Sequence, residues 1–238
     1  MRVSADLSAA VRADHVDVWQ LELDRGRDGD LALLSGDERE RAARFRYEVD
    51  RSRFVTGRAM LRRILACYVG CDPASVPLVY GEFGKPALAG SAGPFFNLSH
   101  SQDVGLLAIS GREVGVDVEH PSGQVDDQVA ERFFAGDEVE MLRSLPPGSR
   151  MRAFLSCWTR KEAYLKAKGG GLRFPLDRFA VSLVPGDEAR MLWSELDRDT
   201  DRWSLVDLSD HVPPCVAALA VPGGSPTVQF HHYGGDIL

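Results

Sequence analysis

Two helices are predicted in the first third of the chain from the spacing of its apolar residues. The first begins at Ser35, because Ser35 and Glu38 form a capping box and residues 37–45 are rich in helix formers. The second can be capped by Asp50 and should end at Gly70. Its apolar side chains recur at helical spacing at Phe54, Leu61, Leu65 and Tyr68. Each segment should therefore turn one apolar face toward a core.

Strands and further helices follow in a repeated order. Runs of β-prone residues bounded by Gly and Pro predict strands at 78–80, 95–98, 104–110 and 114–119. Helices are then predicted at 129–134, 137–145 and 151–168, and strands at 179–184, 203–208 and 215–221. Each half runs from helices to about three strands, which predicts an α+β fold built from a duplicated unit. The halves, 1–118 and 119–238, repeat the order of elements without clear residue-level similarity.

The composition is that of a globular protein. The 238 residues are 44% hydrophobic and 26% charged, which suffices to bury a core. The longest apolar run, residues 215–221, is too short to cross a bilayer, and the first 14 residues carry scattered charges and no apolar signal segment. We therefore expect a cytoplasmic protein with no membrane partner. The four cysteines lack CxxC spacing, and reduced thiols are expected; a zinc site at Cys67 and Cys71 is disfavoured because no partner ligands lie nearby in the sequence.

The charge pattern narrows the choice of partners. A net charge of −7 argues against nucleic-acid binding, which needs a basic surface. Between residues 39 and 63, however, nine arginines stand against three acids. Either a small polyanion binds this stretch or it is a solvated helical face, and composition favours neither explanation.

Asp117 and Glu119 are the first candidates for chemistry. They alternate with Val114, Val116 and Val118 in a strand pattern, so both carboxylates should leave the same face. Carboxylates this close repel each other, and an oxygen-preferring divalent ion such as Mg²⁺ can compensate them. For an isolated pair, a solvated hairpin edge is the more common explanation.

The helix predicted at 151–168 favours the metal site over the solvated edge. Trp158, Glu162 and Lys166 lie at successive fourth positions and share one stripe of that helix. An ordinary surface pair between Glu162 and Lys166 would stabilise a helix by only about 0.2–0.5 kcal/mol, and it stays an alternative for those two residues. Glycines 169–171 end the helix and allow a ligand to approach the backbone.

Together these segments resemble the signatures of the 4′-phosphopantetheinyl transferase superfamily, Sfp type. The similar segments are GVDVE (115–119), WTRKEAYLKAKGGGL (158–172), FNLSHS (96–101) and GKP (84–86), with Arg53 at a coenzyme A contact. The similarity runs in order from about residue 35 to about 185 and leaves the first 30 residues and the tail unassigned. One departure is Gly170, where members of the family often carry a charged residue.

The resemblance implies an enzyme that transfers 4′-phosphopantetheine from coenzyme A to a serine of an apo carrier protein and releases adenosine 3′,5′-bisphosphate. Asp117, Glu119 and Glu162 would hold Mg²⁺, or Mn²⁺ in its place, and Lys161 and Lys166 would act beside the pyrophosphate. Glu162 would accept the serine proton, directly or through a metal-bound water. The residues implied to bind coenzyme A are Arg46, Arg53, Lys85, Pro86, Ser99, His100, Lys161 and Lys166.

The resemblance also implies two similar α/β halves in a pseudo-twofold arrangement, with the ligand cleft between them. Residues 1–118 would contact adenosine and phosphates, and residues 119–238 would carry the metal and the catalytic helix. The expected partners are acyl or peptidyl carrier domains of fatty-acid, polyketide or nonribosomal peptide synthases, including those of secondary metabolite biosynthesis, served by a monomer. Two alternatives remain: a non-catalytic coenzyme A or carrier-binding module, opposed by the three intact acids, and a metal-dependent phosphodiesterase or nuclease, opposed by the net charge.

Overall fold

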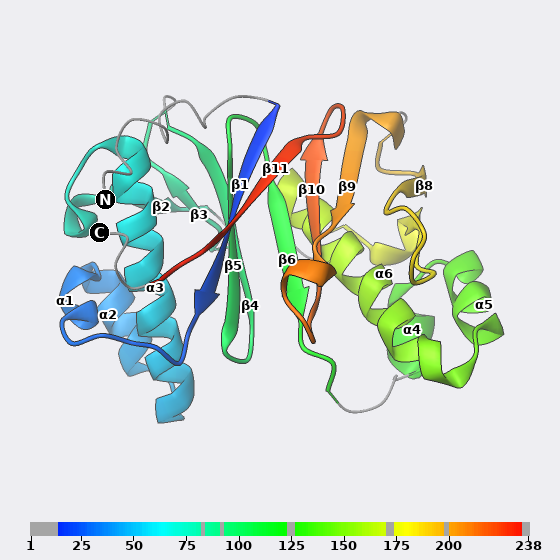
Figure 1. Ribbon diagram of the computed structural model, residues 1–238, viewed down its shortest axis with the longest axis horizontal. Helices are drawn as coiled ribbons and strands as arrows, with labels where there is room; N and C mark the ends of the chain where they lie inside the picture. Colours follow the sequence, from blue (N-terminus) through cyan, green and yellow to red (C-terminus); the bar gives the residue numbers. More distant parts are fainter. Residues whose placement is uncertain are drawn as a thin grey trace.

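Two β-sheets lie face to face in the middle of the molecule, and helices cover the outer face of each (Figure 1). The computed structural model describes residues 14–81, 84–90, 93–122, 127–169, 174–197 and 200–234. The layers follow the order helix, sheet, sheet, helix, so the expected α+β class is confirmed.

The helices form near the predicted capping and stop signals, with some shifted ends. Helix α2 (Gly36–Ala43) begins after Ser35, which shares a capping box with Glu38. Helix α3 (Glu48–Val69) begins earlier than expected, with Asp50 inside its first turn, and ends at Gly70 in the left-handed conformation. Helix α6 (Pro147–Lys168) begins within the expected Pro-Pro-Gly break, since proline is tolerated at the start of a helix. The other α-helices are α1 (Asp30–Leu33), α4 (Asp127–Phe133) and α5 (Gly136–Ser144).

The first sheet has the strand order β11-β1-β5-β4 and the second has the order β6-β10-β9. Strand β5 pairs antiparallel with β1 and β4, and β11 pairs parallel with β1. Strand β10 pairs antiparallel with both of its neighbours, and β2 with β3 and β7 with β8 form small hairpins. The strands are β1 (His15–Glu22), β2 (Leu78–Tyr80), β3 (Pro86–Leu88), β4 (Phe95–Ser101), β5 (Val104–Ser110), β6 (Gly115–Glu119), β7 (Phe179–Val181), β8 (Met191–Ser194), β9 (Trp203–Asp207), β10 (Val216–Pro222) and β11 (Thr227–His232).

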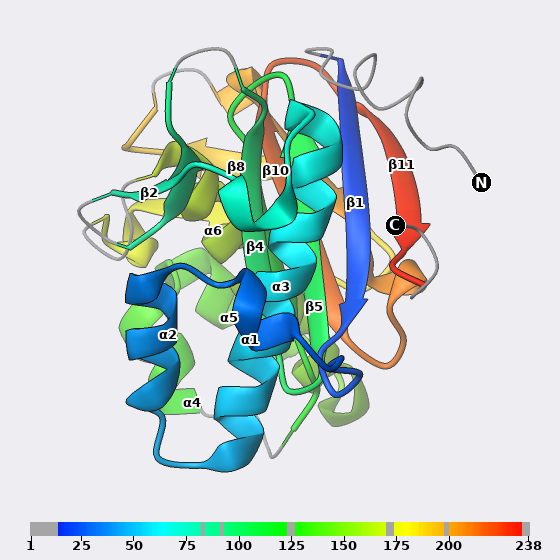
Figure 2. The same ribbon diagram turned by 90° about the vertical axis from the view of Figure 1, so that its left-hand side faces the viewer.

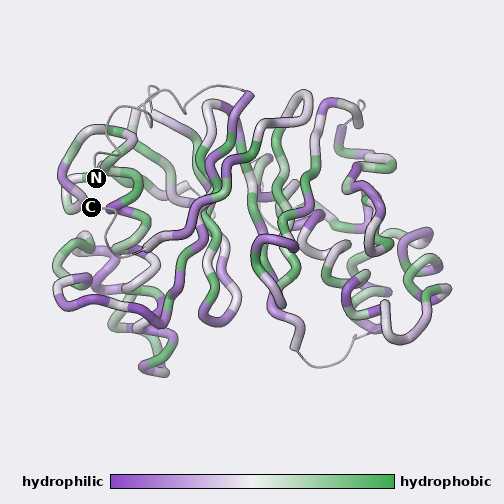
Figure 3. Tube along the Cα trace, in the orientation of Figure 1, coloured by the Kyte–Doolittle hydropathy of each residue, from purple (hydrophilic) through white to green (hydrophobic). Residues whose placement is uncertain are grey.

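Three apolar clusters hold the layers together. Between the sheets, aliphatic side chains meet, among them Val18, Val116 and Leu219. Helix α3 covers the outer face of the first sheet (Figure 2), and α6 covers that of the second (Figure 1). Strands β5 and β10 are buried on both faces and are mostly hydrophobic along their length (Figure 3). Within the described ranges, no helix is long and apolar enough to cross a lipid bilayer.

The sheets do not divide at residue 118, where the sequence placed the boundary between halves. Strand β6 spans that position and pairs over its whole length with β10, whereas β11 returns from the far end of the chain to pair with β1. The sequence also predicts that the halves join near residues 119–126, and of this segment residues 123–126 lie outside the described residues. The C-terminal strand therefore belongs to the sheet formed by the N-terminal segments.

Sequence reasoning missed strands β1, β3, β8 and β11. Strand β1 is a strand of the first sheet, yet Val16 and Val18 face the second sheet while Trp19 and Leu21 face α3. Because apolar residues point to both faces, the alternation changes phase between Val18 and Trp19, and the regular alternation of a half-exposed strand is absent.

Candidate active site

Gly115 brings strand β6 into direct contact with helix α6. A Cβ atom at this position would lie 2.0 Å from the carbonyl oxygen of Ala163 and 2.4 Å from the backbone nitrogen of Ala167. Only a residue without a side chain allows the two backbones to approach so closely. This contact sets the acidic residues of β6 beside the middle of α6.

Asp117 lies on the side of β6 that faces α6, in a buried position. Its side chain is 3% exposed, while Val116 and Val118 on the opposite side pack between the sheets. The Oδ1 atom of Asp117 is 2.5 Å from Nζ of Lys166, which comes from α6. Glu119, two residues further along β6, is half-buried.

Alternate residues of β4 reach across to β6 and fix these carboxylates. Asn97 accepts a hydrogen bond from the backbone nitrogen of Val116 (2.8 Å). Ser99 donates to Oδ1 of Asp117 (2.8 Å), and Ser101 donates to Oε2 of Glu119 (2.9 Å). The sequence FNLSHS therefore links the edges of the two sheets through its side chains.

Glu162 completes an acidic cluster together with Asp117 and Glu119. Burial, followed by the charge of Asp117, raises the pKa of Glu162, and Glu119 contributes in the same direction. Burial and then the charge of Asp117 raise the pKa of Glu119, against the hydrogen bond from Ser101. Lys166 opposes the rise in both pKa values. The three carboxylates thus interact through space, although they come from β6 and α6.

The donor atoms of this cluster fit a hard divalent cation. Asp117 Oδ2 and Glu162 Oε1 are buried and accept no hydrogen bond, which costs free energy unless a ligand satisfies them. Carboxylate oxygens are the ligands that Mg²⁺ prefers, and a cation would also offset the repulsion among the three acids. In the described part of the chain, no group of three His, Cys, Asp or Glu side chains is already arranged as a metal cage.

A cleft of about 280 Å³ opens next to the acidic cluster. Glu162 and Lys166 of α6 lie on one side of it, and His100 of β4 lines it as well. The other lining residues are Arg41, Arg58, Gly84, Lys85, Pro86, Asn97, Leu98, Leu165 and Gly169. Elements distant in the sequence therefore meet around one cavity.

Basic residues outnumber acids on the wall of this cleft, where Arg41, Arg58, Lys85 and Lys166 stand against Glu162. Burial and the nearby Lys166 lower the pKa of Lys85. Desolvation, followed by the charges of Lys166 and Arg58, lowers the pKa of His100. The positive charges of the arginine and lysine side chains in this wall attract a polyanion.

Arg53 lies in a smaller pocket of about 70 Å³ that shares Arg41, Arg58 and His100 with the cleft. Its guanidinium group binds both carboxylate oxygens of Asp24, at 2.6 and 3.0 Å. Arg53 therefore lies beside the cationic cleft, where the resemblance implied a coenzyme A contact, but pairs with an acid.

The structure does not bring Arg46 to this wall. Arg46 is exposed just before α3, and its guanidinium group lies over the ring of its neighbour Tyr47. It is absent from the linings of the cleft and of the pocket around Arg53.

The structure places Lys161, which was expected to act beside the pyrophosphate, in the core and outside the lining of the cleft. Lys161 is 0% exposed and its Nζ atom is 2.7 Å from Oε2 of Glu138, in α5. The same nitrogen donates to the carbonyl oxygens of Leu176 and Phe179. Adjacent residues of a helix point about 100° apart, so Lys161 faces the core while Glu162 faces the cleft.

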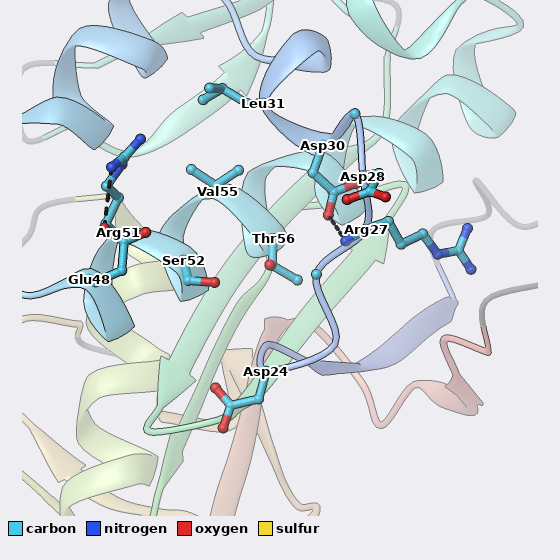
Figure 4. A pocket seen from close by; sticks show the side chains of 12 residues that line it. Asp24, Arg27, Asp28, Asp30, Leu31, Glu48, Arg51, Ser52, Val55 and Thr56 are labelled. Carbon is cyan, nitrogen blue, oxygen red and sulfur yellow. Dashed lines mark hydrogen bonds and ion pairs between the residues drawn. The ribbon is translucent and has the colours of Figure 1, made fainter.

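A second cavity, of about 410 Å³, has the opposite character. It lies beside α1 and the first turns of α3, and Asp24, Asp28, Asp30 and Glu48 all line it (Figure 4). The figure shows Arg51 paired with Glu48 and Asp30 bound to the backbone of Arg27. A wall so rich in carboxylates disfavours a pyrophosphate, and the smaller, cationic cleft is the better candidate site.

Sequence reasoning missed Arg41, Arg58 and Asn97. The two arginines belong to the basic stretch between residues 39 and 63, but the spacing of nine arginines does not tell which of them face the cleft. Gly170, Gly171 and Leu172 of the second signature lie outside the described residues.

Comparisons with known proteins match both the N-terminal and the C-terminal part of the chain to one family. A model described as 4′-phosphopantetheinyl transferase, N-terminal, matches residues 27–111, and the model of the 4′-phosphopantetheinyl transferase superfamily matches residues 113–217. The 4′-phosphopantetheinyl transferase HetI of Nostoc sp. is 40% identical over 231 residues, which cover 93% of each chain. The 4′-phosphopantetheinyl transferase Sfp of Bacillus subtilis is 28% identical over 153 residues, covering 64% of this chain and 68% of the relative. Among solved structures, Thermotoga maritima holo-[acyl-carrier-protein] synthase covers 47% of this chain and 62% of its own, with 21% identity and a TM-score of 0.36.

The chain belongs to the 4′-phosphopantetheinyl transferase superfamily. Within the superfamily it is an Sfp-type enzyme, since its relatives include the Bacillus transferases and both the N-terminal and the superfamily models match. The family resemblance drawn from its four sequence segments is confirmed.

Proposed function

We propose that this enzyme transfers the 4′-phosphopantetheine group of coenzyme A to a serine hydroxyl of an apo carrier protein, with Mg²⁺, and releases adenosine 3′,5′-bisphosphate. The observation that supports this most is the meeting of two unlike environments in one cleft. The unpartnered oxygens of Asp117 and Glu162 lie next to a wall of cations. A pyrophosphate together with a divalent ion satisfies both.

Asp117, Glu119 and Glu162 would hold the cation. When bound, Mg²⁺ would act as a Lewis acid toward the pyrophosphate oxygens. The hydrogen bonds from Ser99 and Ser101 orient two of the carboxylates before any ligand arrives, which lowers the cost of ordering them at the moment of binding.

Glu162 is suited to accept the proton of the attacking serine. Its carboxylate lines the cleft beside Lys166, so it lies where the serine hydroxyl would approach the pyrophosphate. The serine oxygen forms a bond to the phosphorus atom, the bond to adenosine 3′,5′-bisphosphate breaks, and Lys166 stabilises the departing negative charge.

The cationic wall would bind the phosphates of coenzyme A. Lys85, Pro86 and His100 line the cleft, and Arg53 lies in the adjoining pocket with Arg41 and Arg58. In this proposal the segments before residue 118 contact adenosine and its phosphates, and the segments after it supply Glu162 and Lys166. The 22-residue helices α3 and α6, each on the outer face of one sheet, are consistent with the proposed pair of similar halves.

Mass spectrometry of the carrier tests the proposal. Purified enzyme, apo acyl or peptidyl carrier protein, coenzyme A and Mg²⁺ are mixed, and the carrier should gain the mass of one phosphopantetheine. Addition of excess EDTA should stop the transfer, and added Mg²⁺ should restore it. A carrier that stays unmodified, or transfer that continues in EDTA, contradicts the proposal or its metal requirement respectively.

Which synthase supplies the carrier, whether fatty-acid, polyketide or nonribosomal peptide, stays a prediction to be tested with carriers of each kind. A monomeric state and a cytoplasmic location stay predictions too. They are checked by light scattering of the purified enzyme and by fractionation of the source cells.

A further inference from the structure

Lys166 lies at the acidic cluster and pairs with Asp117. Its Nζ atom is 2.5 Å from Oδ1 of Asp117 and 2.9 Å from Oγ of Ser99, which also donates to Oδ1 of Asp117. Its positive charge also acts on Glu119 and Glu162. The ammonium group of Lys166 is thus felt by all three acids that the proposed function assigns to the cation.

The contact between Lys166 and Asp117 places an ammonium group where a divalent cation would bind. An ammonium group in contact with Asp117 Oδ1 opposes a divalent cation at the same oxygen, because like charges repel and because Lys166 and Ser99 already donate hydrogen bonds to that oxygen. The unpartnered Oδ2 atom of Asp117 alone does not relieve that repulsion.

The ammonium group of Lys166 is also placed where it can move away from Asp117. Its side chain is 29% exposed and lines the cationic cleft, whereas Lys161 on the same helix is fully buried among three partners. A lysine has a long flexible chain and no fixed geometry, so its ammonium group can move to a phosphate oxygen in the cleft while its helix stays in place.

We propose that Lys166 and the divalent cation compete for Asp117, so that Lys166 restrains metal binding in the absence of coenzyme A. The pyrophosphate of coenzyme A gives Lys166 a new partner and releases Asp117 to the metal, and by linkage the metal favours coenzyme A equally. This inference rests on the proposed function, in which the same three acids bind the ion. It predicts that replacing Lys166 strengthens metal binding. Replacing a lysine that merely helps to assemble the site would weaken metal binding instead.

The test measures the binding of Mn²⁺ alone, without coenzyme A, from the loss of the electron paramagnetic resonance signal of free Mn²⁺. The proteins are the wild type, Lys166→Met, and the control Arg58→Met. Arg58 lines the same cleft and carries the same charge, but its guanidinium group lies over the rings of Phe54 and Tyr80, not at the acids. Lys166→Met should bind Mn²⁺ at least about tenfold more tightly than wild type, and Arg58→Met should change by less than about threefold, because only a charge in contact has the larger effect.

A further variant locates the ion. Adding Asp117→Asn to Lys166→Met should abolish the gain in Mn²⁺ affinity. The proposal is overturned by unchanged or weaker Mn²⁺ binding in Lys166→Met, by an equal gain in Arg58→Met, or by a gain that survives Asp117→Asn. None of these outcomes affects the carrier mass assay, so the proposed competition can fail while the transferase function stands. Transfer by the wild type that continues in EDTA would instead show that the proposed metal role had failed.

Discussion

Lys161 and Glu138 form a buried ion pair, with 2.7 Å between Nζ and Oε2 and with both side chains almost fully enclosed. Glu138 also accepts hydrogen bonds from the backbone nitrogens of Ala135 and Val181. The pair therefore ties α5, α6 and strand β7 together on the side of α6 that faces away from the cleft.

Replacing Lys161 should damage the fold first and the chemistry second. Lys161→Met leaves the charge of Glu138 buried without its partner, which should lower the free energy of unfolding by about 3–5 kcal/mol. The double variant Lys161→Met with Glu138→Gln should recover part of that loss, since it removes the unpaired charge. Urea unfolding measures both effects, and a Lys161→Met protein of native stability without transferase activity would return Lys161 to a direct role in catalysis.

Gly115→Ala should separate β6 from α6. The new methyl group would overlap the backbone of Ala163, so the expected loss of stability is about 3 kcal/mol or more. Transfer should fall as well, because the overlap pushes Asp117 away from Glu162. Gly148→Ala is the control, because Gly148 lies in α6 and nothing is within 4 Å of the added atom. It should retain stability in thermal melts and activity in carrier assays.

Glu162→Gln should keep the fold and lose the reaction. The amide can neither accept the serine proton nor carry the charge that a cation needs, and a general base is typically worth about 10² to 10⁴ in rate. The exposed Glu140→Gln is the matched control. Single-turnover transfer to a carrier measures the loss, and a Glu162→Gln enzyme within tenfold of wild type would exclude Glu162 as the base.

Arg53→Ala should weaken the binding of coenzyme A, and it should weaken the binding of dephospho-coenzyme A less if Arg53 contacts the 3′-phosphate. Asp24→Ala breaks the same ion pair but frees the guanidinium group, so it should maintain or increase affinity. Arg46→Ala should change little, because Arg46 lies outside the cleft lining. Calorimetric titration with both ligands decides, and equal losses with the two ligands would remove Arg53 from the 3′-phosphate.

Asp17 should make the fold sensitive to acid. Burial alone raises the pKa of Asp17, but hydrogen bonds from His231 and Tyr68 outweigh it, and the net pKa lies below the ordinary value of 3.8. A lowered pKa in the folded state contributes stability that is present above about pH 3.8 and is lost as the pH falls through the folded value.

As the pH falls below about 3.8, the free energy of unfolding should therefore drop more steeply in the wild type than in Asp17→Asn. Denaturant titrations at several pH values give both slopes, with the exposed Asp187→Asn as control. Parallel slopes for the wild type and Asp17→Asn would show that the cluster around Asp17 does not contribute to acid unfolding.

Local signals in the sequence predicted much of the secondary structure. The capping box at Ser35 and the stop at Gly70 depend on contacts within one turn, and both form as expected. Strand β1 could not be recognised in the same way, because a strand buried on both faces lacks the alternation that marks a half-exposed one.

The sequence by itself determined which chemistry the chain can carry: two acids two apart in a strand, an acid and a lysine four apart on a helix, and an arginine-rich segment. Only the tertiary structure decided how these groups meet. Packing at Gly115 puts Asp117 beside Lys166, and the direction in which each side chain leaves α6 sends Lys161 into the core and Glu162 into the cleft. Sequence spacing specifies the order of groups along one element, whereas contacts between elements depend on how their backbones pack in space.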